Sequence, residues 1–333
     1  MLQHNTMSST DTTSNNDDFE FYRYSPTMGA SILFTVLFAI SSLAIIYVVF
    51  SAARKTKVKA QSWQQLTGVR KYDIGKLTGA HIPLIVGCVV ELAGYIGRCV
   101  SAHNQEAMGP YIEQSILLLI APTLYAGSIY MIFGRMAHLL FAEKIMIMPA
   151  RFNTAVFVCG DIASLLLQAA GGGLMASADS QESGSNLVTA GLFIQIAFFG
   201  LFIINEFIFY FRVFKLPSDI PRKTSTWKTL NLNLLVNSFL ILIRSIVRAI
   251  EFIQGYSGFI ASHEWFLYVF DALPMFAFTV IFIATFHIGN IYIIQEESVQ
   301  LQSYNTNNYS YDSNDEESMR ELDHVPTYIN EIK

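Results

Sequence analysis

Ionisable residues occur inside long apolar stretches of this sequence, at spacings that place them on one face of a helix. In the stretch 230–254 the polar residues recur at intervals of three, four or seven, and they are Asn233, Asn237, Arg244, Arg248 and Glu251. A charge in the hydrocarbon core of a membrane costs several kcal/mol, so such a stripe must face protein or water. We interpret it as one wall of a polar cavity or groove.

Other apolar stretches carry the same signal. Glu91 and Arg98 share a helical face with two glycines, and Asp161 shares one with Gln168. Ten residues are candidates for a substrate or translocation path: Glu91, Arg98, Gln114, Asp161, Gln168, Glu206, Arg244, Arg248, Glu251 and Asp271. Two interpretations stay open. The residues form a cavity for a polar headgroup, or they form ion pairs that only hold the helices together, such as Arg244 or Arg248 with Glu91 or Asp271.

The familiar signatures of enzymes are missing. No HExxH, GxSxG or Walker-type sequence occurs, the histidines are scattered, and the three cysteines have no CxxC spacing. We therefore predict no enzyme, no catalytic residue, no metal site and no cofactor. The glycine run 171–173 does not follow a strand and precedes no lysine, so it indicates close helix packing or a helix end rather than a phosphate loop.

The elements that position these residues are seven apolar stretches. The chain of 333 residues is 52% hydrophobic and only 14% charged, and a membrane core needs roughly 20 apolar residues in a helix. The fold class is therefore predicted to be all-α, a polytopic membrane protein with seven transmembrane helices at about 29–50, 77–97, 111–134, 153–177, 187–211, 230–254 and 265–288.

The connecting segments differ in charge. Segments 51–76, 135–151 and 212–228 hold fifteen of the 21 basic residues, whereas the alternate segments 99–112, 177–186 and 255–264 hold none. The positive-inside rule then predicts the N-terminus outside and the C-terminus in the cytosol. The predicted organisation is an extracellular polar segment (1–28), a seven-helix transmembrane domain (29–290) and a cytosolic, disordered acidic tail (291–333).

Several segments resemble a known family. ELAGYIGR (91–98), GDIASLLLQAAGGG (160–173), RSIVRAIEFIQGYSG (244–258) and SHEWFLYVFDALPM (262–275) are similar to successive signatures of the fungal lipid-translocating exporters. The resemblance runs in order from about 25 to 290. It implies a multi-pass protein of the plasma membrane, or of vacuolar or other internal membranes, that transports an amphipathic molecule. The implied substrates are sterol-like, sphingoid-base or porphyrin-like, and transport would confer resistance to toxic ones.

The partners implied are membrane lipids and an amphipathic small molecule, with no nucleic acid, while the cytosolic tail is a candidate site for regulatory proteins. If a proton gradient drives export, the candidate proton carriers are Glu91, Asp161, Glu206 and Asp271. The alternative is a seven-helix receptor-like sensor that regulates lipid asymmetry or a stress response. An intramembrane hydrolase is a further alternative, although it lacks its zinc ligands.

The orientation is directly testable. Tags placed after Phe21 and near Ser183 should react with membrane-impermeant reagents on intact cells, because both sites are predicted to lie outside. Tags near Lys57 and after Tyr304 should react only after permeabilisation. Labelling of the Lys57 site on intact cells would overturn the predicted orientation.

Overall fold

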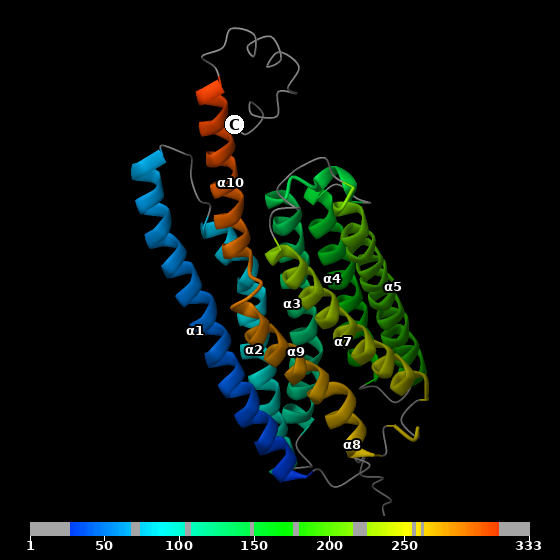
Figure 1. The fold of residues 1–333 in the computed structure, drawn as a ribbon. Coiled ribbons are helices and arrows are strands. Elements are labelled where there is room, and N and C mark those ends of the chain that lie inside the picture. The colour runs from blue at the N-terminus through cyan, green and yellow to red at the C-terminus, as the bar shows by residue number, and fades with distance from the viewer. Residues whose placement is uncertain are drawn as a thin grey trace, which may run out of the picture.

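The computed structural model describes residues 27–67, 74–103, 108–146, 150–175, 180–215, 225–254, 258–260 and 263–312. These residues form helices and no strand (Figure 1). The helices are α1 (Met28–Thr67), α2 (Ile74–His103), α3 (Met108–Leu139), η1 (Glu143–Ile145), α4 (Ala150–Met175), α5 (Gln181–Val213), α7 (Thr226–Gln254), α8 (Glu264–Leu267), η3 (Tyr268–Ala272), α9 (Leu273–Phe286) and α10 (Ile291–Asp312).

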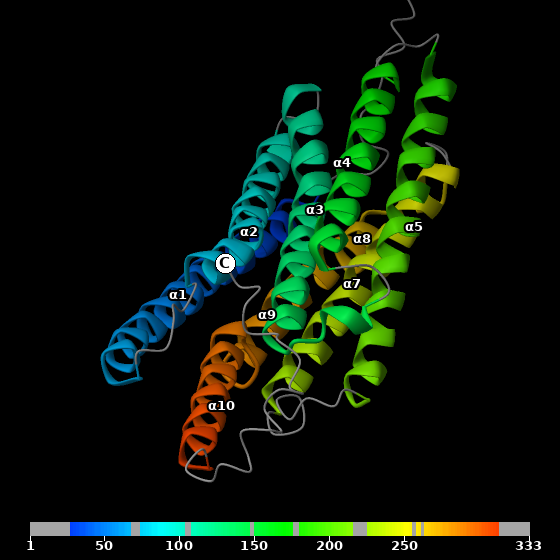
Figure 2. The same cartoon turned by 90° about the horizontal axis from the view of Figure 1, so that it is seen from above.

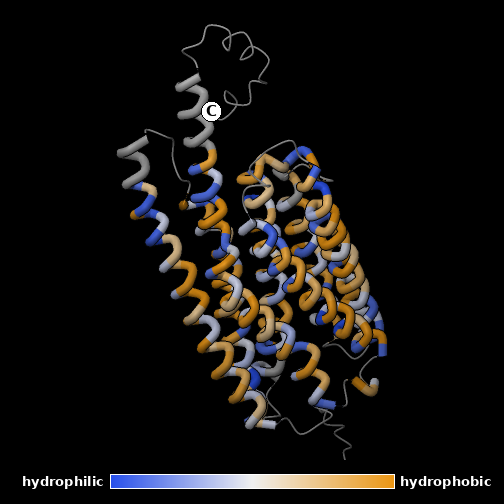
Figure 3. The backbone as a smooth tube through the Cα atoms, in the orientation of Figure 1, coloured by the Kyte–Doolittle hydropathy of each residue, from blue (hydrophilic) through white to orange (hydrophobic). Residues whose placement is uncertain are grey.

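Seven helical stretches in the described part of the chain are long and apolar enough to cross a membrane. Each overlaps one of the seven predicted segments, so the predicted fold class is confirmed. Hydrophobic residues follow the whole length of the bundle, with hydrophilic residues interrupting the helices (Figure 3). Most of the predicted N-terminal segment lies outside the described residues.

The seventh crossing is not one regular helix. It consists of α8, the π-helical turn η3 and α9, and a turn at 287–290 separates α9 from α10. In η3 the amide of Leu273 donates to the carbonyl oxygen of Tyr268, five residues back. Pro274, which has no amide hydrogen, follows at once. The structure also differs from the predicted tail, because residues 291–312 form the helix α10 and only 313–333 lie outside the described residues.

Helix α3 occupies the middle of the bundle. It packs against α2, α4 and α7, and Figure 2 shows it between α2 on one side and α4 and α5 on the other. Glycines allow some of these contacts to be close. A Cβ atom on Gly87 would lie 2.7 Å from the ring of Tyr125, and one on Gly94 would lie 2.9 Å from Leu118. Small residues at such positions let membrane helices approach each other.

Helix α1 lies at the edge of the bundle and is tied to it at both ends. Where α1 begins, the amide of Thr27 donates to Glu264 at 2.9 Å, and near its other end Lys59 pairs with Glu296 at 2.8 Å. We call these two ends of the bundle the Thr27 end and the Lys59 end. The last turns of α1 and α5 lie at the Lys59 end (Figure 1), and these helices carry exposed basic residues of the predicted cytosolic segments near those ends, Lys55, Lys57 and Arg212.

The glycine run 171–173 is a close-packing feature at its first residue only. A Cβ atom on Gly171 would lie 2.6 Å from the carbonyl oxygen of Gly184, and the converse distance is also 2.6 Å, so α4 and α5 touch through their backbones. A Cβ atom on Gly172 would have no neighbour within 4 Å among the described residues.

This difference predicts unequal effects of the same substitution. Gly171→Ala should lower stability in detergent by about 1–3 kcal/mol, because the added methyl group forces two backbones apart. Gly172→Ala is the matched control and should keep or slightly raise the melting temperature, because alanine favours the helix over glycine and nothing crowds the added methyl group. Equal melting temperatures for the two variants, measured on purified protein, would contradict the close α4–α5 contact.

Candidate functional site

Arg244 of α7 joins three crossings of the bundle. Its Nε pairs with Oδ1 of Asp271 in η3, and its Nη2 donates to the carbonyl oxygen of Leu118 in α3 at 2.6 Å. That carbonyl is available because Pro122, four residues later, has no amide hydrogen to donate to it. Arg244 is 4% exposed, so both of its partners are reached inside the protein.

The π-helical turn brings a second arginine to the same aspartate. Nη2 of Arg248 donates to Oδ2 of Asp271 at 3.3 Å, while its Nη1 donates to Glu251 at 3.1 Å. Asp271 is therefore shared by two arginines of α7. A single turn of π-helix re-aims the side chains that follow it, and such turns are frequent at functional sites.

Glu91 of α2 is buried close to these charges. It is 1% exposed, and the charges that act on its carboxyl are those of Arg244 and Asp271, with the hydroxyl of Tyr125 beside it. The structure assigns the predicted ion pairing of both arginines to Asp271. We define the charged cluster as Glu91, Arg244, Arg248, Glu251 and Asp271.

A second ionic contact lies at the Thr27 end. Nη2 of Arg98 donates to Glu264 at 3.0 Å, and its Nε donates to the hydroxyl of Tyr268 at 3.1 Å. Glu264 also accepts hydrogen bonds from the amide and hydroxyl of Thr27. One carboxylate thus holds α1, α2 and the last crossing together. Gln114, buried on α3, lies opposite Gly97, one residue before Arg98.

Uncharged polar groups form a separate chain between α3, α4 and α5. Nε2 of Gln168 donates to Ser164 at 2.7 Å and to Oε1 of Gln195 at 3.1 Å. Nε2 of Gln195 in turn lies 3.5 Å from the hydroxyl of Thr123. Gly191 makes room for this chain, because a Cβ atom there would lie 2.9 Å from Gln168. Amide groups of this kind hydrogen-bond helices together inside a membrane.

Two buried carboxyls have hydroxyl partners instead of cations. Oδ2 of Asp161 accepts from the hydroxyl of Tyr130 at 2.9 Å, and Oε2 of Glu206 lies 3.4 Å from the hydroxyl of Ser238. Their other oxygens, Oδ1 and Oε1, are buried without a hydrogen-bond partner among the described residues. Within the same residues neither carboxyl takes part in an ion pair.

The structure therefore divides the ten candidate residues between several places. Five form the charged cluster, Arg98 and Gln114 lie nearer the Thr27 end, Asp161 and Gln168 face α3 and α5, and Glu206 faces α7. The polar residues of α4 thus face α3 and α5, whereas the two arginines of α7 face the last crossing. No group of three or more histidines, cysteines, aspartates or glutamates in the described part of the chain could hold a metal ion.

Residues outside the predicted set complete these contacts. Glu264 pairs with Arg98, and Tyr130 pairs with Asp161. The sequence carried a signal for Tyr130, because a tyrosine buried in an apolar helix usually finds a hydrogen-bond partner. Glu264 lies in the signature-like segment 262–275, but the spacing of residues along the chain does not reveal that its partner is Arg98.

Fold and site together define a multi-pass membrane protein with an ionic network buried among its crossings. Comparison with known proteins gives the family: the family described as RTA1 like protein matches residues 84–295. Protein RTA1 of Saccharomyces cerevisiae is 59% identical over 287 residues, covering 86% of this chain and 90% of that relative. The chain belongs to the RTA1-like family, and its resemblance to the fungal lipid-translocating exporters is confirmed.

Other relatives have names that state an activity. Protoporphyrin uptake protein 1 of S. cerevisiae is 44% identical over 299 residues, covering 86% of this chain and 98% of that relative. Sphingoid long-chain base transporter RSB1 of S. cerevisiae is 28% identical over 245 residues, covering 62% and 64%. Both names describe transport or uptake and not an enzyme. No solved structure matches the chain.

Arg244 should be far less tolerant of change than its lipid-facing neighbour. Arg244→Ala leaves Asp271 with one arginine and leaves the Leu118 carbonyl oxygen without its side-chain donor. We expect the variant to lose about 3–5 kcal/mol of stability. Ile243→Ala is the control, because Ile243 is 45% exposed. Thermal unfolding in detergent measures both variants.

A double substitution separates the ion pair from other effects. Removing Asp271 as well as Arg244 should cost clearly less than the sum of the two single alanine variants, because the second change removes a charge that has already lost a partner. Strict additivity would contradict the pairing.

Proposed function

We propose that this chain moves an amphipathic, lipid-like molecule across the plasma membrane, and that removing toxic molecules of this class confers resistance to them. The observation that carries the proposal is polar burial inside apolar crossings. Eight of the ten candidate residues are at most 5% exposed: Glu91, Arg98, Gln114, Asp161, Gln168, Glu206, Arg244 and Asp271. Intramembrane ionisable groups of this kind mark substrate and ion pathways.

The polar groups lie at successive depths, which suits passage of a headgroup. By helical rise, Asp271 lies about 10 Å from Glu264, and Arg244 lies about 15 Å from the end of α7 at the Thr27 end. Counted from the Lys59 end, Glu206 lies about 10 Å inside α5 and Asp161 about 16 Å inside α4. A headgroup would therefore meet polar partners on its way through the bundle.

The charged cluster suits substrates of either sign. An ammonium group, as in a sphingoid base, would compete with Arg248 for Asp271, whereas the carboxylates of a porphyrin would compete for Arg244 or Arg248. Because Asp271 has two arginine partners and Arg248 also pairs with Glu251, such an exchange would leave each of these charges with one partner. The names of the relatives support substrates of both kinds. A sterol-like molecule is the third candidate.

We further propose Asp161 and Glu206 as proton carriers, if a proton gradient drives export. Each carboxyl has a hydroxyl partner and no ion pair among the described residues, so a proton can be taken up or released without breaking one. Asp271, held by two arginines, is a weaker candidate than the sequence suggests, and Glu91 lies close to the same charges.

The orientation remains the one proposed from the charge of the connecting segments, with the N-terminus outside and the C-terminus in the cytosol. The acidic tail beyond α10 is proposed as the site for cytosolic regulatory proteins. In this orientation the Thr27 end, with Arg98 and Glu264, faces outward.

Purified protein in liposomes tests the function. A labelled sphingoid base, a labelled sterol and a porphyrin are supplied in turn, and we expect faster transbilayer movement of at least one of them than in empty liposomes. Ile243→Ala should keep this activity, while folded protein carrying Arg244→Lys should lose most of it, because lysine cannot hold two partners in the planar arrangement of arginine. Binding of a probe without movement of any would contradict transport and favour the receptor-like sensor.

The same liposomes test the proton carriers. Asp161→Asn keeps the shape of the side chain, so it should preserve folding and binding but abolish the dependence of transport on pH. A destabilised variant whose remaining transport keeps the wild-type pH profile would remove Asp161 from the mechanism.

A further inference from the structure

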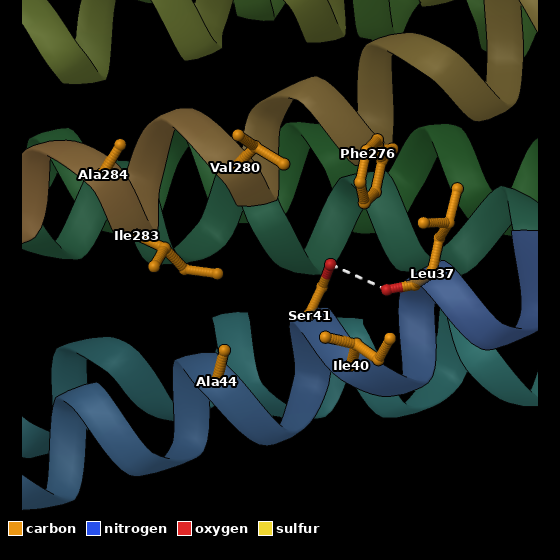
Figure 4. A pocket seen from close by; sticks show the side chains of 8 residues that line it. All are labelled: Leu37, Ile40, Ser41, Ala44, Phe276, Val280, Ile283 and Ala284. Carbon is orange, nitrogen blue, oxygen red and sulfur yellow. Dashed lines mark hydrogen bonds between the residues drawn. The ribbon is translucent and has the colours of Figure 1, made fainter.

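A groove of about 280 Å³ runs between α1 and α9 (Figure 4), and no residue of the charged cluster lines it. Helix α1 contributes one wall and α9 the other, and the lining residues are Leu37, Ile40, Ser41, Ala44, Phe276, Val280, Ile283 and Ala284. Small side chains, Ala44 and Ala284, leave the space open.

The lining side chains offer no free hydrogen-bond donor to an occupant, and their one acceptor, the Ser41 hydroxyl oxygen, belongs to a residue that is only 5% exposed. Ser41 is the one polar residue among the eight, and its hydroxyl already donates to the carbonyl oxygen of Leu37 at 2.9 Å (Figure 4). An occupant must therefore be apolar along the whole stretch that the groove covers. This excludes a headgroup, an ion or a polar peptide.

The volume decides between apolar occupants. An apolar cavity of about 150 Å³ holds benzene, so 280 Å³ has room for roughly eleven carbon atoms. Eight residues of a helix about 10 Å wide occupy roughly 900 Å³, so a helix from a second copy of the chain could place only a few side chains in the groove. A whole sterol or porphyrin would likewise extend well beyond the groove. A stretch of one hydrocarbon chain matches both the volume and the elongated shape, since the lining residues cover about 10–12 Å along each helix.

The position of the groove makes it reachable from the side. Its rim residues Ile40 and Val280 are 61% and 44% exposed and, in a membrane-spanning helix, they face hydrocarbon. The groove begins ten residues after Thr27, about 15 Å from the Thr27 end. Between these levels Phe34 stacks on Tyr268 and closes the seam between α1 and the last crossing, and at the start of the groove Phe38 is set edge-on to the lining residue Phe276.

We propose that this groove binds the single hydrocarbon chain of the amphipathic substrate, which enters sideways from the bilayer core. The inference rests on the proposed function and adds which part of the substrate is held and where. Long single-chain molecules, such as a sphingoid base, are the class it would take. The headgroup is left free to engage the polar residues of the bundle.

A photoreactive chain tests the proposal. Wild-type protein in phosphatidylcholine liposomes is illuminated with a sphingoid base that carries a diazirine in the middle of its chain. Cross-links should map to residues 37–44 and 276–284, and an excess of unlabelled sphingoid base should suppress them. Cross-links that the competitor does not suppress would mean that ordinary bilayer lipid fills the groove, and would overturn the proposal, as would cross-links between two copies of the chain through these residues.

Filling the groove provides the matched comparison. Ala44→Phe and Ala284→Phe should each reduce the competed labelling at least fivefold, because the new ring occupies the space of the chain. Leu43→Phe is the control, since Leu43 is 69% exposed on the neighbouring face of α1 and does not line the groove. Undiminished labelling in the filled variants would overturn the proposal. If a phenylalanine variant fails to fold, Ala44→Leu and Ala284→Leu serve in its place.

The labelling and transport experiments can contradict the chain-binding site and the proposed function independently. Competed labelling of the groove by wild-type protein that moves no probe would contradict the proposed function and leave the chain-binding site intact. Transport that is unchanged in folded, groove-filled variants, together with unchanged labelling, would contradict the site and leave the function intact.

Discussion

The contact between Arg244 and Asp271 is the interaction on which the rest of the bundle depends. It joins α7 to the last crossing, and the second hydrogen bond of Arg244, to the Leu118 carbonyl, adds α3. A buried arginine or aspartate alone would carry a large desolvation cost, so each fixes the position of the other. The three helices are thereby set in register, and Arg248 and Glu91 are placed around the same point.

Irregular backbone creates the partners that this network uses. Pro122 leaves the Leu118 carbonyl without its helical donor, and η3 aims Asp271 at two arginines just before Pro274. In a membrane such departures from regular helix occur only where the freed groups are satisfied inside the protein. Here the Leu118 carbonyl that Pro122 frees is satisfied by Arg244, which also belongs to the ionic network. The irregularities that weaken the helices locally therefore help to hold the bundle together.

The bundle separates three kinds of environment. Charged side chains gather between α2, α7 and the last crossing. Amides and hydroxyls connect α3, α4 and α5. An apolar groove lies between the middle of α1 and α9. A molecule with a polar head and one long chain meets a suitable environment for each part. Helix α1, which packs against α2 and is joined to Glu264 and Glu296 near its two ends, leaves the apolar part open to the bilayer.

The sequence by itself determined the seven crossings, the all-α class and the family, because apolar length and residue signatures are local properties that survive without coordinates. It also identified Arg244, Arg248 and Asp271 as residues that cannot face lipid. Only the tertiary structure decided that Asp271 serves both arginines, that the hydrogen-bond partner of Asp161 among the described residues is Tyr130 of α3, and that Gln168 faces α5. The rotation of one helix against another and the π-helical turn set these pairings, and neither is encoded in the spacing of residues along a single helix.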